Sequence, residues 1–132
     1  MTMPQSTSTP GADAAAAVAE HLSRFTYRWT SEIELQEAIW GVLHSRFSAE
    51  RERALSRRDR PDFMVDVDGV SVALEVKVAG ARSAVLRQLG RYAEHDAVDA
   101  IVLASSRRVL AAGIPAIIHR KPVLAINLGG LL

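Results

Sequence analysis

The chain has 132 residues, of which 48% are hydrophobic and 23% are charged, and 16 Lys and Arg nearly balance 15 Asp and Glu for a net charge of +1. This length fits one domain, and the composition excludes a wholly disordered chain. Because the sequence contains no cysteine, a disulfide scaffold, a thiolate zinc site and a cysteine nucleophile are excluded.

The N-terminal part predicts an arm followed by a helix. Residues 1–11 are small and polar and include Pro and Gly, so we expect a disordered arm. The alanine-rich segment from Ala12 to Phe25 predicts a helix. It is a poor signal peptide, and no apolar run reaches the ~18 residues of a membrane span. We therefore expect a cytoplasmic protein with one domain over residues 12–132, a core at 30–128 and no membrane partner.

A second helix is predicted from Ser31 through Phe47. Ser31 and Glu34 form a capping-box pattern, and apolar residues then recur at helical spacing. Glu32 falls inside the apolar sector of this helix, whereas Glu34 falls outside it. A carboxylate in that sector is costly unless it meets a cation or a donor. The alternative is that Glu32 only serves the helix dipole.

A β-hairpin is the best-marked element of the chain. After a predicted strand over residues 48–55 and a turn at 56–60, Phe63–Val67 and Val70–Val78 alternate in polarity around Asp68-Gly69. This dipeptide between two such runs is the strongest short-range hairpin signal.

The hairpin pairing brings charged residues together. If Asp68 and Gly69 form the turn, Asp62 lies opposite Glu75, and Lys77 projects from the same face. Two opposed carboxylates repel, and a divalent cation with oxygen ligands would offset that repulsion. The alternative is that Lys77 alone bridges both acids at a solvated strand end.

The C-terminal half predicts a helix, a strand, a short helix and a last strand, over residues 81–95, 99–105, 106–112 and 122–128. The element order indicates an α/β fold with a mixed central sheet flanked by helices. We find no P-loop, nucleophile-elbow serine or dinucleotide-binding glycine motif in the sequence.

These residues resemble a known motif set. Pro61-Asp62, twelve residues and then Glu75-Val76-Lys77 resemble the PD-(D/E)XK nuclease motif. Glu32 matches the first-helix acid of archaeal Holliday-junction resolvases, and the segment from Gln88 to Tyr92 is similar to the QxxxY element of RecB-type nuclease domains. The resemblance covers residues 30–105 and implies a restriction-endonuclease-like α-β-β-β-α-β core.

The resemblance implies a metal-dependent DNA endonuclease that hydrolyses phosphodiester bonds in repair, recombination or mobile-element and phage DNA processing. It implies Mg²⁺, with Mn²⁺ as a substitute, held by Asp62, Glu75 and the Val76 backbone carbonyl. Glu32 would hold a second ion or an outer-sphere water.

The remaining motif residues receive roles by the same resemblance. Lys77 would orient or deprotonate the attacking water. Gln88 would position that water or the phosphate, and Tyr92 would buttress the helix. Taken without the resemblance, Gln88 is an ordinary edge residue of an amphipathic helix.

The basic residues are nearly all arginine, and six of them fall between residues 46 and 60. We expect a phosphate-contacting rim for DNA, and a solvated charged face is the alternative. The expected DNA-binding residues are Arg51, Arg53, Arg57, Arg58, Arg60, Arg87 and Arg91. Compact nucleases that cut both strands are often dimers, and by this analogy a homodimer can form.

Two other function classes stay open. One is a catalytically silent DNA-binding module with the nuclease fold, acting as a subunit of a larger complex. Saturable DNA binding without metal-dependent nicking would favour it. The other is a structural or oligomeric protein without nucleic acid, for which salt-insensitive behaviour would be expected.

Overall fold

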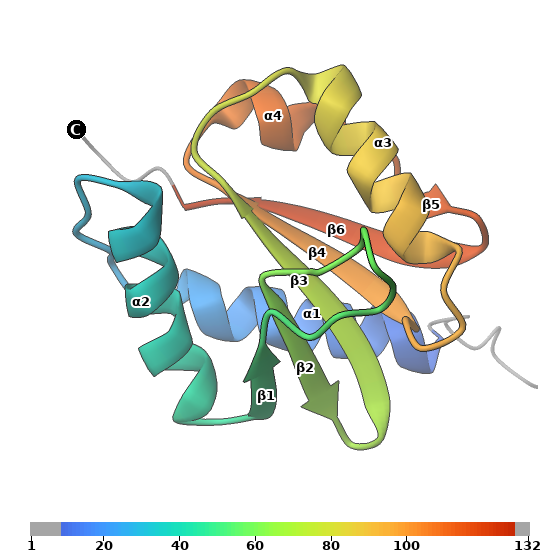
Figure 1. Ribbon diagram of the computed structural model, residues 1–132. Helices are drawn as coiled ribbons and strands as arrows, with labels where there is room; N and C mark the ends of the chain where they lie inside the picture. Colours follow the sequence, from blue (N-terminus) through green and yellow to red (C-terminus); the bar gives the residue numbers. More distant parts are fainter. Residues whose placement is uncertain (1–8, 129–132) are drawn as a thin grey trace, which may run out of the picture.

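The fold is a six-stranded mixed sheet packed against helices, and the computed structural model describes residues 9–128 (Figure 1). The elements in chain order are α1 (Pro10–Ser23), α2 (Glu32–His44), β1 (Ser48–Arg51), β2 (Phe63–Val67), β3 (Val70–Lys77), α3 (Arg82–Ala93), β4 (Ala100–Ser105), α4 (Arg108–Ala112), β5 (Ile117–Ile118) and β6 (Lys121–Asn127).

The sheet has the strand order β1-β2-β3-β4-β6-β5. Strands β1, β2 and β3 form an antiparallel meander, β4 and β6 continue it in parallel, and β5 closes the far edge antiparallel to β6. The predicted hairpin is confirmed, because Val67 pairs with Val70 and both turn residues have positive φ, 51° at Asp68 and 85° at Gly69. Positive φ at both positions is typical of a type I′ turn.

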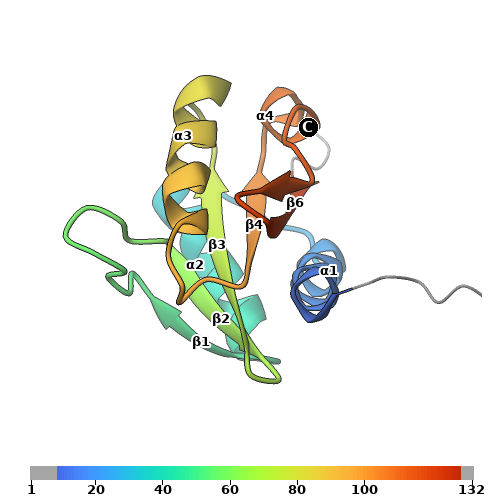
Figure 2. The same ribbon diagram turned by 90° about the vertical axis from the view of Figure 1, so that its right-hand side faces the viewer.

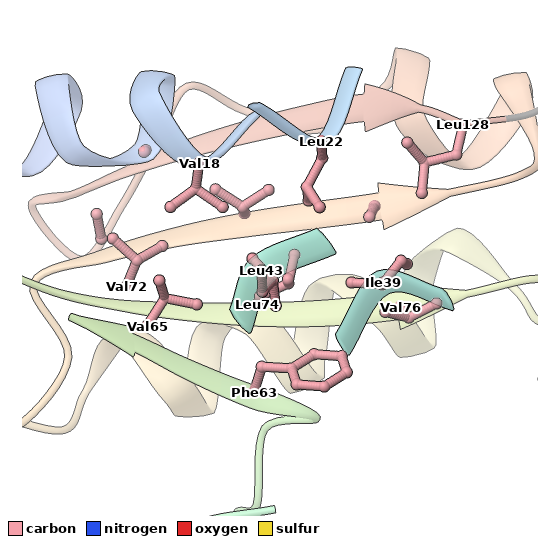
Figure 3. Packing of buried hydrophobic residues seen from close by; sticks show 14 of the residues in the cluster. Val18, Leu22, Ile39, Leu43, Phe63, Val65, Val72, Leu74, Val76 and Leu128 are labelled. Atoms are coloured by element: carbon pink, nitrogen blue, oxygen red, sulfur yellow. The ribbon is translucent and has the colours of Figure 1, made fainter. Parts of the chain in front are cut away.

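Helices cover both faces of the sheet. Helices α1 and α2 pack on one face, where Phe63, Leu74 and Val76 are buried (Figure 3). Helices α3 and α4 pack on the other face, around Leu89 and Ile101. Figure 2 shows α1 and α3 on opposite sides of β3 and β4. The two faces are thus both apolar, which is typical of a sheet that contains parallel strands.

Helix α2 begins and buries one side as predicted, but only half of the expected capping box forms, because the Glu34 carboxylate accepts the backbone N–H of Thr30 at 2.7 Å instead of that of Ser31. The Ser31 hydroxyl accepts a hydrogen bond from the Glu34 N–H at 3.2 Å. Leu35, Ile39 and Leu43 are fully buried on one side of the helix. The helix ends at His44, earlier than expected.

The start of α1 and the end of β1 also differ from the sequence prediction. Helix α1 begins at Pro10, with the Thr9 hydroxyl as its N-cap, so Pro10 and Gly11 of the expected arm are helical; residues 1–8 lie outside the described part. The expected strand over 48–55 ends at Arg51, because Glu52 has a φ of 50°, which an extended strand does not accommodate.

A further difference is the β5–β6 hairpin, which the sequence did not predict. Its two turn residues, His119 and Arg120, have φ values of 46° and 67°. Asn and Gly are the usual residues in such a turn, so the usual sequence signal is missing. Between residues 9 and 128, no helix is both long and apolar enough to cross a bilayer.

Candidate active site at the ends of β2 and β3

A cluster of charged groups lies where β3 ends and β2 begins. The nearly buried Glu75 carboxylate accepts the Asp62 backbone N–H at 3.3 Å through Oε1 and pairs with Lys77 Nζ at 3.2 Å through Oε2. Asp62 Oδ2 accepts the Val76 N–H at 2.8 Å. The two acids and the lysine therefore lie together as the hairpin register predicted.

Two side chains of α3 extend this cluster. Tyr92 is buried and donates its hydroxyl hydrogen to Glu75 Oε1 at 2.9 Å, and Gln88 Nε2 donates to the Tyr92 hydroxyl oxygen at 2.9 Å. Residues four apart lie on one side of a helix, so α3 presents both groups to the same strand end. In this arrangement Gln88 orients Tyr92, and Tyr92 orients the catalytic candidate Glu75.

Burial dominates the electrostatics of the acid pair. Burial and the neighbouring Glu75 carboxylate raise the pKa of Asp62 to about 7. Burial also raises the pKa of Glu75, although Lys77 and the Tyr92 hydroxyl oppose that rise. The Tyr92 pKa is raised by burial and by the Glu75 charge. The site thus disfavours two negative charges unless a cation accompanies them.

Glu32 lies near this cluster but does not complete a ligand set with it. It is the first residue of α2 and half-buried, and its charge contributes to the raised pKa of Asp62. In the described part of the chain, no three His, Asp or Glu side chains converge as a metal site.

The donors present fit a magnesium ion. Asp62 and Glu75 supply carboxylate oxygens, and Mg²⁺ commonly binds through one or two carboxylates while keeping several waters. The Val76 carbonyl is a third donor: continuing the β2–β3 register by two residues places Pro61 opposite Val76, and proline has no N–H to donate to it. Three protein oxygens are therefore available at this strand end.

A second polar cluster, which the sequence did not reveal, anchors the arginine loop (residues 52–62). Asp59 is 6% exposed and accepts hydrogen bonds from Arg91 Nε at 2.9 Å and His95 Nε2 at 2.8 Å. Burial alone would raise the pKa of Asp59, but the two donors outweigh it and lower that pKa. Arg91 and His95 are each more than 30 residues from Asp59 in sequence, so no local sequence pattern predicts these contacts.

The structure separates the expected DNA-binding arginines into two groups. Arg51 and Arg91 have intramolecular partners: Arg51 pairs with Glu37 at 2.8 Å and lies over the Trp40 ring, and Arg91 holds Asp59. The arginine loop and α3 carry the others, which are exposed and form no ion pair with any described residue. These are Arg53, Arg57, Arg58, Arg60 and Arg87.

Replacing Asp59 with alanine is expected to destabilise the protein by about 2 kcal/mol, because it leaves two donors without their buried acceptor. The arginine loop should then detach, and trypsin should cut it faster. Urea unfolding and limited trypsin digestion measure the two effects. Glu20→Ala is the matched control, since it removes an acid from the exposed Arg24 pair and should change stability by less than about 0.5 kcal/mol. Equal digestion of both variants would contradict the anchoring role.

Comparison with protein-family models, with curated proteins and with solved structures gives no match.

Proposed function

We propose that this protein is a metal-dependent DNA endonuclease of the PD-(D/E)XK type, with α2, β1, β2, β3, α3 and β4 as its restriction-endonuclease-like α-β-β-β-α-β core. The observation that carries the proposal is the contact network of Asp62, Glu75, Lys77 and Tyr92 at one strand end. Acids and a lysine in one cluster supply what phosphodiester hydrolysis needs: ligands for a cation and a group that handles the attacking water.

Each residue has a role that its contacts support. Asp62, Glu75 and the Val76 carbonyl would hold Mg²⁺, which supplies positive charge and lowers the pKa of a bound water. Lys77 would orient the attacking water and offset the negative charge that develops on the phosphate. Tyr92 fixes the Glu75 carboxylate through its hydroxyl.

Two further residues act at the margin of this site. Gln88 fixes Tyr92, so we assign it a positioning role. Glu32 lies close enough to influence Asp62 and would hold an outer-sphere water. The exposed arginines of the arginine loop would contact phosphates flanking the scissile bond.

Cleavage assays with the purified protein test the proposal. Supercoiled plasmid, single strands and a four-way junction are incubated with Mg²⁺, with Mn²⁺ or with EDTA. We expect cutting with either metal and none with EDTA. The absence of cutting with both metals, on all three substrates, would contradict the proposal.

A second candidate is a catalytically silent DNA-binding module with the same fold. The Lys77–Glu75 ion pair favours it, because it neutralises the buried carboxylate without any metal. Salt-sensitive DNA binding without nicking would support this candidate over the nuclease.

A further inference from the structure

A groove runs along the outer side of α3, between that helix and the residues around β5. Its volume is about 610 Å³, and its lining includes Leu86, Gly90, Pro115 and Ile118. Figure 1 shows β5 beside the C-terminal half of α3. A Cβ at Gly90 would meet no atom within 4 Å, so there is free space beside this residue.

The charged residues that line the groove are mostly basic: three arginines and one acid, Glu94. Arg87 and Arg91 of α3 and Arg58 of the arginine loop line it. Arg87 and Arg91 are four residues apart and so lie on the same side of the helix. Arg91 uses Nε to bind Asp59, which leaves its terminal nitrogens for an anion. Three guanidinium groups around one groove favour a phosphate-bearing ligand.

The floor of the groove favours unpaired bases. Leu86, Pro115 and Ile118 are apolar, and the bases of a duplex are stacked and paired away from such a surface. A single strand instead offers exposed base faces together with its phosphates. A volume of about 610 Å³ is in the range of small-molecule sites, which suits one or two nucleotides.

The groove borders the candidate active site through α3 itself. Arg91 contacts Asp59 at the arginine loop, and the next residue, Tyr92, contacts Glu75. One turn earlier, Arg87 lines the groove and Gln88 donates a hydrogen bond to the Tyr92 hydroxyl. The groove and the acid pair therefore lie on two sides of the same helix.

The β5–β6 turn brings a strained residue to the same groove. His119 lines it with a φ of 46°, which costs energy in a residue other than glycine. Its ring faces Glu94, at 3.7 Å between Nε2 and Oε1. The turn thus keeps an unfavourable conformation at the edge of a basic groove, and such strain is concentrated at functional sites.

We infer that this groove binds a single-stranded nucleic-acid segment, with phosphates at Arg58, Arg87 and Arg91 and bases on the apolar floor. The inference rests on the proposed function in that the bound segment is the unpaired part of a nuclease substrate. The substrate class is then DNA with a single-stranded portion, such as a flap or an overhang.

Gly90→Glu tests the inference, with Gly41→Glu as its matched control. Both glycines are in helices with free space around the position of a Cβ, so both variants should fold and both change the net charge equally. Fluorescence anisotropy measures binding of labelled oligo-dT and of a duplex of equal length, in EDTA. Because EDTA prevents metal-dependent cutting, binding is measured whether or not the protein is a nuclease.

We expect Gly90→Glu to weaken oligo-dT binding by about tenfold and Gly41→Glu by less than about twofold. Duplex binding should change little in either variant. Arg87→Gln should lower the slope of log affinity against log salt by about 0.7, the value for one phosphate contact of a single strand.

Three results would overturn the inference. Equal losses in the two glutamate variants would indicate a general charge effect. An equal loss for duplex would indicate a duplex-binding rim. Displacement of oligo-dT by an acidic peptide at equal concentration would indicate a protein-docking groove.

Discussion

Lys77→Ala is expected to lower the rate of DNA cleavage by about 10²- to 10⁴-fold and to leave DNA affinity within about twofold. The Lys77 ammonium lies at the acid pair, 3.2 Å from Glu75, and not on the arginine loop. Its loss should therefore affect the chemical step more than substrate binding. Single-turnover cleavage with Mg²⁺ and filter binding in EDTA measure the two quantities separately.

The control for this variant is Arg24→Ala, which also removes a cation from an ion pair but does so at the exposed C-terminal end of α1. It should cleave at the unaltered rate. Lys77→Ala leaves the Glu75 carboxylate without its counter-charge, so a melting curve must first show that the variant is folded. Loss of cleavage and of binding to the same extent in a folded Lys77→Ala would contradict the assigned role.

Asp62→Asn is expected to abolish at least ~99% of the cleavage activity and yet to stabilise the metal-free protein. The asparagine carbonyl can still accept the Val76 N–H, so the strand end keeps its hydrogen bond. The substitution removes one of two carboxylates that burial and mutual repulsion disfavour. We expect the melting temperature to rise by about 4 °C at a pH of about 8 in EDTA.

The pH dependence follows from the raised pKa of Asp62. Folding shifts this pKa from 3.8 to about 7, so the folded protein binds a proton more tightly than the unfolded chain does. Its contribution to stability is complete below a pH of about 4 and is lost as the pH rises through about 7. Asp62→Asn should remove this decline, and Mg²⁺ should reduce it in the unaltered protein.

Asp66→Asn is the matched control, because Asp66 is an exposed acid in β2 whose Oδ1 accepts the Gly69 N–H. It should keep both the activity and the pH profile of the unaltered protein. If the melting temperature without metal depends on pH in the same way in Asp62→Asn and in the unaltered protein, the conclusion that the two buried carboxylates disfavour each other is contradicted.

The sequence predicts those parts of the site that depend on local rules. Asp68-Gly69 determines the turn, the turn determines the register, and the register places Asp62 opposite Glu75. The spacing of Gln88 and Tyr92 predicts one helix face in the same way. The roles of these residues in catalysis remain predictions.

The parts that sequence reasoning missed depend on tertiary contacts. Asp59 reads as one acid in an arginine run, and only the fold brings Arg91 and His95 to it. Arg51 reads as a rim residue, but the packing of β1 beside α2 gives it Glu37 and Trp40 as partners. Sequence periodicity cannot predict such contacts, because they join side chains from distant parts of the chain.

The alternation of β3 has a consequence for the insertions that the chain can accept. Glu75 faces α3, and its neighbours Leu74 and Val76 face α1 and α2. One extra residue between Val72 and Glu75 would either form a bulge or turn both Glu75 and Lys77 into the apolar layer under α2. Length changes in this segment of β3 should therefore be strongly selected against, whereas the exposed part of the arginine loop that precedes Asp59 can vary in length.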